Sequence, residues 1–289
     1  RSTLFPYTTL FRSRDDDILL NGNEASFYDA GTHSLYSFDL ERHRCRLLVT
    51  FTDQDYNFRK ILKGSAVSDS AIIYLADDAL GLFSYDRNRG TLTHVVTDLP
   101  IVAKATYIDK SNIIWVSVPS KGVKGYYINS NYEQIAQYST DNCDLPSNDI
   151  TYITTLPNGN LLTAHSDVGV CVIDRSSLDM GTVNVNIIDN LKNVTSTLIN
   201  NDDRETLYAT SGYGLISIKR TFLGQIRHLY ENADGIISYD NYVSALEEPQ
   251  GTVILGTLGN GLCRIDLLTH NRISRSEQRR VGKECRSRW

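Results

Sequence analysis

The sequence has no apolar run approaching the roughly 18 residues that a membrane-spanning helix requires. It also lacks the order of charged segment, apolar stretch and small-residue cleavage site that marks a secretion signal. Neither a membrane span nor a signal peptide is therefore expected within these 289 residues. A longer parent protein could carry both.

Basic stripes and closely spaced cysteines are also missing. The formal net charge is −5, and because both ends are basic, the part between them is more acidic still. Nucleic-acid backbones bind to clusters of Lys and Arg, so a nucleic-acid partner is not expected. No two cysteines form a CxxC pair, which argues against a zinc site or a disulfide framework and favours isolated buried thiols. The five cysteines are Cys45, Cys143, Cys171, Cys263 and Cys285.

Catalytic motifs are absent as well. The chain has no GxSxG, no HExxH, no Walker loop and no complete EF-hand. The segment GTLGNG at 256–261 joins two expected strands instead of opening a helix, so it is no nucleotide fingerprint. We expect no catalytic residue, no metal and no cofactor. A lyase or hydrolase that uses His165 with Asp167 stays open as a third possibility.

A six-residue signature recurs through the chain at a nearly constant spacing. GLFSYD, GVCVID, GLISIK and GLCRID are clear copies, and SLYSFD and KGYYIN are weaker ones. The copies end at Asp39, Asp86, Asn129, Asp174, Lys219 and Asp266, with separations of 47, 43, 45, 45 and 47 residues. A period of this length indicates a repeat architecture.

Each repeat is predicted to contain four short strands. The signature follows an apolar run such as IIYLA at 72–76, and turn segments such as LPNGN at 156–160 precede that run. The strands are rich in Ile, Val, Leu, Tyr and Thr, as buried strands prefer. Four strands per unit, without helical periodicity, predict an all-β fold, a β-propeller with about six visible blades. A β-sandwich with coincidental spacing is the alternative.

The repeats also carry a family resemblance, clearest in DNYVSALEEPQGTVILGTLGNGLCRID at 240–266. This pattern resembles the two-component regulator propeller repeat of the periplasmic sensor regions of bacterial hybrid histidine kinases. The resemblance covers residues 18–273 and is weaker where Ser34 replaces the signature glycine and in the third copy, whose glycine is out of register. Gly-His with Trp-Asp, the mark of WD40 repeats, is absent.

The resemblance implies a non-catalytic periplasmic sensor that signals in response to oligosaccharides released from polysaccharides. Its partners would be an oligosaccharide or a neighbouring sensor domain, and the full-length receptor, a histidine kinase, would be a homodimer. Family propeller regions exceed six repeats, so the chain looks like an incomplete fragment whose membrane attachment lies in missing downstream segments. The alternative is a propeller scaffold for protein–protein interaction or dimerisation without direct ligand binding.

In a propeller, the loops between second and third strands share one face with the loops between successive blades, and such loops commonly hold binding residues. Here they contain aromatic side chains beside Asp and Asn, which suits a sugar ring with its apolar C–H side and its hydroxyls. Each residue alone could equally be an ordinary solvated turn residue. The candidate ligand residues are Tyr56, Asp77, Asp78, His165, Asp167, Tyr213, Tyr239, Tyr242 and Asn260.

The two ends do not match the repeats. RSTLFPYTTLFRS at the start and RRVGKECRSRW at the end resemble translated sequencing-adapter fragments. Residues 1–13 and 277–289 are therefore interpreted as artefacts, and residues 14–276 as the repeat region. An edge strand TTLFR that pairs with the last blade is the alternative for the start.

Overall fold

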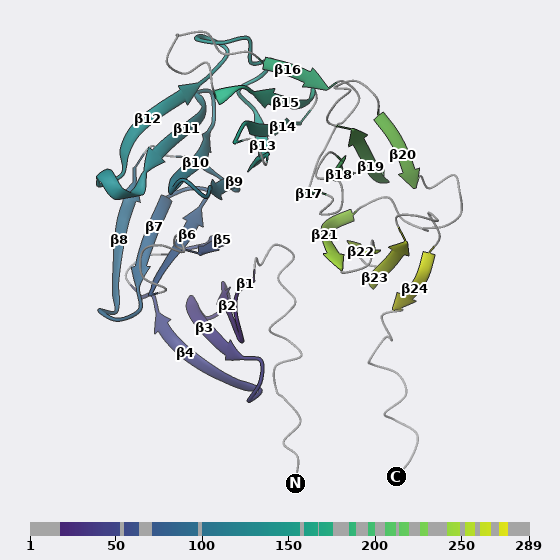
Figure 1. The fold of residues 1–289 in the computed structure, drawn as a ribbon. Helices are drawn as coiled ribbons and strands as arrows, with labels where there is room; N and C mark the ends of the chain where they lie inside the picture. The colour runs from purple at the N-terminus through teal and green to yellow at the C-terminus, as the bar shows by residue number, and fades with distance from the viewer. Residues whose placement is uncertain are drawn as a thin grey trace. The chain divides into compact units, whose positions relative to one another are not determined.

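The computed structural model describes most of the first half of the chain and the strands of the second half (Figure 1). The described residues belong to two compact units, one up to Ile153 and one from Thr154. The ends at 1–13 and 277–289 lie outside the described residues, so their adapter origin stays a prediction. The described ranges are 18–52, 55–63, 71–97, 100–156, 159–166, 168–175, 185–188, 196–199, 206–211, 214–219, 226–230, 242–248, 252–257, 261–266 and 272–276.

The described strands form six sheets of four strands, in chain order within each sheet. The first unit begins with β1 (Leu19–Asn21), β2 (Glu24–Asp29), β3 (Ser34–Asp39) and β4 (Arg44–Thr50). The second sheet contains β5 (Phe58–Lys63), β6 (Ile72–Asp77), β7 (Gly81–Asp86) and β8 (Thr91–Val96). The third contains β9 (Val102–Ile108), β10 (Ile113–Val118), β11 (Gly122–Tyr127) and β12 (Glu133–Tyr138), with the short 3-10 helix η2 (Ile128–Ser130) after β11.

The remaining strands follow the same order. The fourth sheet contains β13 (Ile150–Thr155), β14 (Leu161–His165), β15 (Gly169–Ile173) and β16 (Val185–Ile188). The fifth contains β17 (Ser196–Ile199), β18 (Thr206–Ser211), β19 (Gly214–Lys219) and β20 (Ile226–Tyr230). The sixth contains β21 (Tyr242–Glu248), β22 (Thr252–Thr257), β23 (Gly261–Asp266) and β24 (Arg272–Ser276). The prediction of an all-β chain with four short strands per repeat is confirmed.

The signature provides the third strand of the sheets, and in the first two sheets its final aspartate closes the hairpin to the fourth strand. Asp39 Oδ1 accepts hydrogen bonds from the backbone N–H groups two and three residues further on, at 3.0 and 2.8 Å. Asp86 Oδ1 makes the same two bonds at 2.9 and 3.1 Å. Both turns end in a left-handed residue, His43 with φ 51° and Gly90 with φ 66°. The recurring Asp is thus explained by the local hydrogen bonding of an Asx turn.

The third sheet corrects the register of the third signature copy. Gly122 lies directly opposite Val118, just as Gly81 lies opposite Asp77 at the start of β7. The strand therefore begins at Gly122 and ends at Tyr127, not at Asn129, which belongs to η2. Gly122 takes φ 76° at this turn, where glycine is favoured.

The second glycine of that strand, Gly125, has a packing role. A Cβ atom on Gly125 would lie 2.7 Å from Cζ3 of Trp115, whose side chain is completely buried. The strand thus carries one glycine for its turn and another for the indole ring. This pair of glycines is why the sequence pattern alone misplaced the register.

Consecutive sheets of the first unit contact one another through their first two strands. The strands β1 and β2 contact β5, and the strands β5 and β6 contact β9. In the second unit, β17 and β18 contact β21 in the same way. In the first unit, Figure 1 shows the fourth strands β4, β8 and β12 as the outer strands of their sheets.

Two apolar clusters fill the spaces between the sheets of the first unit. The first lies between the first and second sheets and consists mainly of aromatic side chains, and the second lies between the second and third sheets. We call the end with the β2–β3, β6–β7 and β10–β11 connections the loop end, and the end with the β3–β4 and β7–β8 hairpins the turn end. The first cluster contains Tyr28, Leu35, Phe51, Tyr56, Phe58, Ile61, Ile73, Leu75, Phe83 and Tyr85.

Candidate ligand-binding site

Hydrogen bonds join the loops at the loop end of the first unit. Tyr28 Oη donates to the Tyr56 carbonyl at 2.6 Å, which ties β2 to the loop before β5. The side-chain amide of Asn148 donates to the Ser120 carbonyl at 3.0 Å, which ties the loop before β13 to the turn between β10 and β11. In this unit, loops that the sequence predicts to share one face are therefore in direct contact.

Tyr56, a predicted ligand residue, lies in the core between the first two sheets. Its side chain is 8% exposed and stacks on Phe58 with a ring-centroid distance of 5.1 Å. Phe51 and Phe83 meet the same ring edge-on, at 5.7 and 5.4 Å. The Tyr56 ring therefore supports the loop end from inside, and its flat face is covered by protein.

Asp77, another predicted ligand residue, holds two loops together. Its carboxylate is 2% exposed and accepts the backbone N–H of Asn57 at 2.7 Å. Its other oxygen accepts the N–H groups of Ala79 and Leu80, at 2.8 and 3.0 Å. Three backbone donors thus occupy this carboxylate, which gives it a positioning role.

Asp78 is the more accessible of the two neighbouring carboxylates. Its Oδ1 accepts the backbone N–H of Ala103 at 2.7 Å, which links the second sheet to β9. Its Oδ2 lies 3.0 Å from Arg59 Nε, and the Asp78 side chain remains 44% exposed. A ligand at the loop end can therefore reach Asp78 more readily than Asp77.

His165 ends β14 and is completely buried. Its Nε2 lies 3.1 Å from the Thr163 hydroxyl, two residues earlier on the same strand. The predicted partner of His165, Asp167, lies outside the described residues. Burial keeps the imidazole away from the solvent-exposed surface.

The other predicted ligand residues belong to the second unit. Tyr213, Tyr239 and Asn260 lie outside the described residues. Tyr242 begins β21, of which the backbone is described. Their roles in binding stay predictions.

A groove that the sequence did not predict opens between β4 and the β7–β8 pair. It has a volume of about 580 Å³, and we call it the aromatic groove. Its walls come from two sheets, which is why no local sequence pattern indicates it. The lining residues are Val49, Thr50, Phe51, Thr52, Tyr56, Leu80, Phe83, Tyr85, Gly90, Leu92 and His94.

His94 provides the exposed ring of the aromatic groove. Its imidazole stacks on Phe83 with a centroid distance of 4.4 Å and an interplanar angle of 10°. The two residues are direct cross-strand partners in β7 and β8. Exposed Thr50 and Thr52 border the same space with hydroxyl groups. A flat ring beside hydroxyls suits a ligand with one apolar and one polar side.

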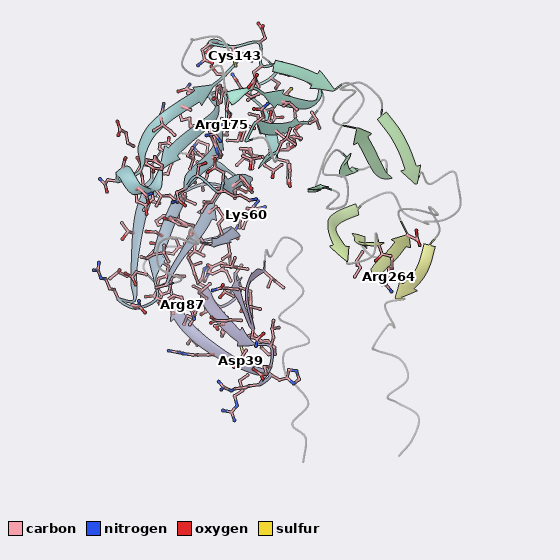
Figure 2. All side chains as sticks on the ribbon, viewed as in Figure 1. Asp39, Lys60, Arg87, Cys143, Arg175 and Arg264 are labelled. Atoms are coloured by element: carbon pink, nitrogen blue, oxygen red, sulfur yellow. The ribbon has the colours of Figure 1, made fainter. Side chains whose placement is uncertain are left out.

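A second cavity, of about 640 Å³, lies at the turn end of the first sheet, and we call it the charged cavity. Asp39, labelled in Figure 2, belongs to its lining. Three carboxylates and three guanidinium groups belong to its lining. The lining residues are Asn21, Asn23, Glu24, Ser37, Asp39, Glu41, Arg42, Arg44, Cys45 and Arg46.

A bidentate ion pair between Glu24, in the lining of the charged cavity, and Arg87 connects the first sheet to the second. Arg87, also labelled in Figure 2, donates through Nη1 and Nη2 to the two carboxylate oxygens of Glu24, at 2.9 and 2.5 Å. The Ser37 hydroxyl donates to the same carboxylate. These bonds, above all the two from Arg87, lower the pKa of Glu24. Glu24 is thereby committed to holding the first two sheets together.

Within the described ranges, no three His, Cys, Asp or Glu side chains gather as a metal ion would require. The same part of the chain contains no helix of the length and apolar character that crossing a bilayer demands.

The fold resembles several solved structures of bacterial extracellular proteins. The extracellular domain of BT4673 from B. thetaiotaomicron, described as a hybrid two-component system, superposes with a TM-score of 0.66 and 16% identity, covering 86% of this chain and 31% of that one. The corresponding domain of BT3049 from the same organism gives 0.65 and 14%, covering 90% and 34%. The chain has the fold of these extracellular domains.

A third neighbour with this fold belongs to a secretion system. PorZ, an essential surface component of the type-IX secretion system of Porphyromonas gingivalis, superposes with a TM-score of 0.63 and 12% identity. The match covers 90% of this chain and 41% of PorZ. The chain thus spans well under half the length of each of these neighbours. No family model matches the sequence, and no curated protein matches it.

Proposed function

We propose that the six four-stranded sheets are blades of a β-propeller and that this chain is a sensor segment of a hybrid two-component system. The fold shared with the extracellular domains of such systems carries the proposal. Contacts between successive sheets through their inner strands support it, because radially arranged blades pack in this manner. The parent protein is then a longer receptor with a histidine kinase.

The proposed location is the periplasm, outside the inner membrane. The extracellular placement of the neighbouring structures supports this location. The parent receptor would act as a homodimer and would reach the membrane through a downstream segment. Its direct partners would be an oligosaccharide or an adjoining sensor domain.

The proposed ligand is an oligosaccharide released from a polysaccharide. The aromatic groove supports this class, because its exposed His94 ring offers a stacking surface and Thr50 and Thr52 offer hydroxyl groups. Asp78 adds a partly exposed carboxylate at the loop end. A sugar ring needs this combination of an apolar face and polar edges.

The sensor role is proposed to be non-catalytic. Asp77 already accepts three backbone hydrogen bonds, and His165 is completely buried. Neither group is placed to transfer a proton to a polysaccharide at the surface. If the chain hydrolysed or cleaved a polysaccharide and the His165→Ala variant did not, this part of the proposal would be contradicted.

Calorimetric titration of the intact ectodomain with a panel of neutral and acidic oligosaccharides tests the proposed ligand class. For a ligand that binds, His94→Ala should weaken binding by about threefold to tenfold, which corresponds to one aromatic contact. Thr93→Ala is the matched control, because Thr93 is exposed on the opposite face of β8. Absence of binding to the whole panel by a folded protein would refute oligosaccharide sensing.

The alternative function is a scaffold for protein–protein interaction or dimerisation. PorZ supports this alternative, because a secretion-system component has the same fold. Under it, the triple variant Tyr213→Ala, Tyr239→Ala and Tyr242→Ala would leave the signalling response of the full receptor unchanged. Loss of that response, with normal folding and dimerisation, would favour ligand sensing.

A further inference from the structure

The charged cavity contains two arginines, Arg44 and Arg46, for whose side chains the structure shows no hydrogen bond or ion pair with the described residues. Arg44 and Arg46 lie two residues apart on β4, so their side chains leave the same face of the strand. The spacing is about 6.6 Å along the strand at 3.3 Å per residue. Both side chains are exposed, and both line the cavity.

Neither arginine forms an ion pair with any residue that the structure describes. The nearby carboxylates have other partners. Glu24 accepts both guanidinium nitrogens of Arg87, and Asp39 accepts two backbone N–H groups of its turn. The cavity therefore presents two guanidinium groups whose hydrogen-bond donors are available to a ligand.

The repeat itself does not require these arginines. In the first sheet, Arg44 lies opposite Asp39 and Arg46 lies opposite Ser37. In the second sheet, the same two positions opposite Asp86 and Ser84 hold Thr91 and Thr93. The hairpin has the same capped turn in both sheets, so this turn does not require the arginines.

We infer that Arg44 and Arg46 form a binding site for the anionic groups of an acidic oligosaccharide. Guanidinium groups bind carboxylate and sulfate through paired hydrogen bonds, and both anions occur on sugars. Asn21 and Asn23 line the same cavity with groups that can bond sugar hydroxyls. This inference rests on the proposed oligosaccharide-sensing function and specifies the ligand class.

The alternative explanation is protection of an edge. The strand β4 is the outer strand of its sheet, and charged side chains on such strands prevent pairing with other chains. Protection needs charge of either sign and no particular ligand. The two explanations therefore differ in whether an anionic sugar binds more tightly than its neutral counterpart.

The first experiment titrates the intact chain with a tetramer of galacturonic acid and with its methyl ester. The two ligands share a backbone and differ in charge. We expect the acid to bind about tenfold more tightly than the ester at low ionic strength, with a smaller difference at high salt, because exposed ion pairs are screened. A sulfated tetrasaccharide in a parallel titration distinguishes sulfate from carboxylate as the preferred group.

The second experiment compares two variants. The double variant Arg44→Gln, Arg46→Gln should weaken binding of the acidic tetramer about tenfold, the effect of losing two exposed charged contacts. Arg89→Gln is the matched control, because Arg89 is an arginine of the equivalent turn in the second sheet and its side chain is 82% exposed. Unchanged thermal unfolding midpoints establish that both variants fold.

The outcomes separate this inference from the proposed function. Equal binding of acid and ester would overturn the acidic site while leaving oligosaccharide sensing intact. Unchanged affinity in the double variant, or equal losses in the double variant and Arg89→Gln, would also overturn it. Absence of binding to either acid would do the same. Absence of binding to every neutral and acidic member of the panel would refute the proposed function as well.

Discussion

Replacement of Asp109 by Ala should strongly destabilise the first unit. Asp109 is 5% exposed and organises the turn between β9 and β10. Its Oδ1 accepts the backbone N–H groups of Ser111 and Ile113, at 2.8 and 3.0 Å. Its Oδ2 accepts the indole N–H of Trp115 at 2.9 Å. One carboxylate therefore joins the turn to a completely buried ring.

The expected cost follows from the burial of the donors. Trp115 is completely buried, and the hydrogen bond to the Ile113 N–H is buried as well. Loss of an acceptor costs about 1–3 kcal/mol for each buried donor that it served. With a smaller contribution from Ser111, Asp109→Ala should lower the free energy of unfolding by about 3–4 kcal/mol.

Asp39→Ala is the matched control. Asp39 also accepts two backbone N–H groups in a turn, but those hydrogen bonds are exposed and involve no indole ring. It should cost about 1 kcal/mol, as for other side-chain caps of exposed backbone donors. The loss in free energy of unfolding for Asp109→Asn should lie between those of the two alanine variants. The amide oxygen remains as one acceptor, whereas the amide nitrogen replaces the other carboxylate oxygen.

Urea unfolding provides the measurement. The chain contains two tryptophans, Trp115 and Trp289, so fluorescence reports on the third sheet and far-UV circular dichroism reports on all strands. Trp289→Phe leaves the Trp115 signal alone. If Asp109→Ala proves no more destabilising than Asp39→Ala, the buried carboxylate does not have the role argued for it.

Two further changes test the packing and the ion pair of the first unit. Gly125→Ala should cost about 1–3 kcal/mol by overpacking, since its Cβ would lie 2.7 Å from the Trp115 ring, whereas Gly31→Ala should have little effect; equal midpoints in urea for the two variants would contradict this packing argument. Glu24→Gln should cost about 1 kcal/mol at pH 7. Because the folded-state pKa of Glu24 is below its ordinary value of 4.5, this difference should persist above pH 4.5 and shrink as the pH falls through the folded-state pKa. A difference that stays constant from pH 7 to pH 3 would show that the carboxylate of Glu24 does not contribute through its charge.

The strand pattern was predictable because its causes are local. Alternation of apolar residues, the turn segments and the aspartate that caps the β3–β4 and β7–β8 hairpins all act within a few residues. The one error of register came from a longer-range cause. The sequence offers Gly122 and Gly125 as alternatives, and only the position of the Trp115 ring explains why Gly125 lies within the strand.

The sequence predicted which loops hold the candidate ligand residues, but it did not predict which of their side chains are exposed. The sequence placed Tyr56 and Asp77 in loops, where a ligand commonly binds. Packing of the second sheet against the first buries both of them, and leaves Asp78 as the more accessible group. The aromatic groove and the charged cavity depend on side chains from strands whose proximity no sequence window contains.

The sequence by itself determined the repeat length, the four strands of each repeat and the capped hairpin, because these depend on hydrogen bonds and alternation within one sheet. The tertiary structure decided which side chains remain available to a ligand. Tyr56 and His94 are both aromatic and lie near strand ends, yet one is enclosed by Phe51, Phe58 and Phe83 and the other is exposed. Burial depends on what the neighbouring sheet places against a residue, and that information lies about one repeat away in the chain.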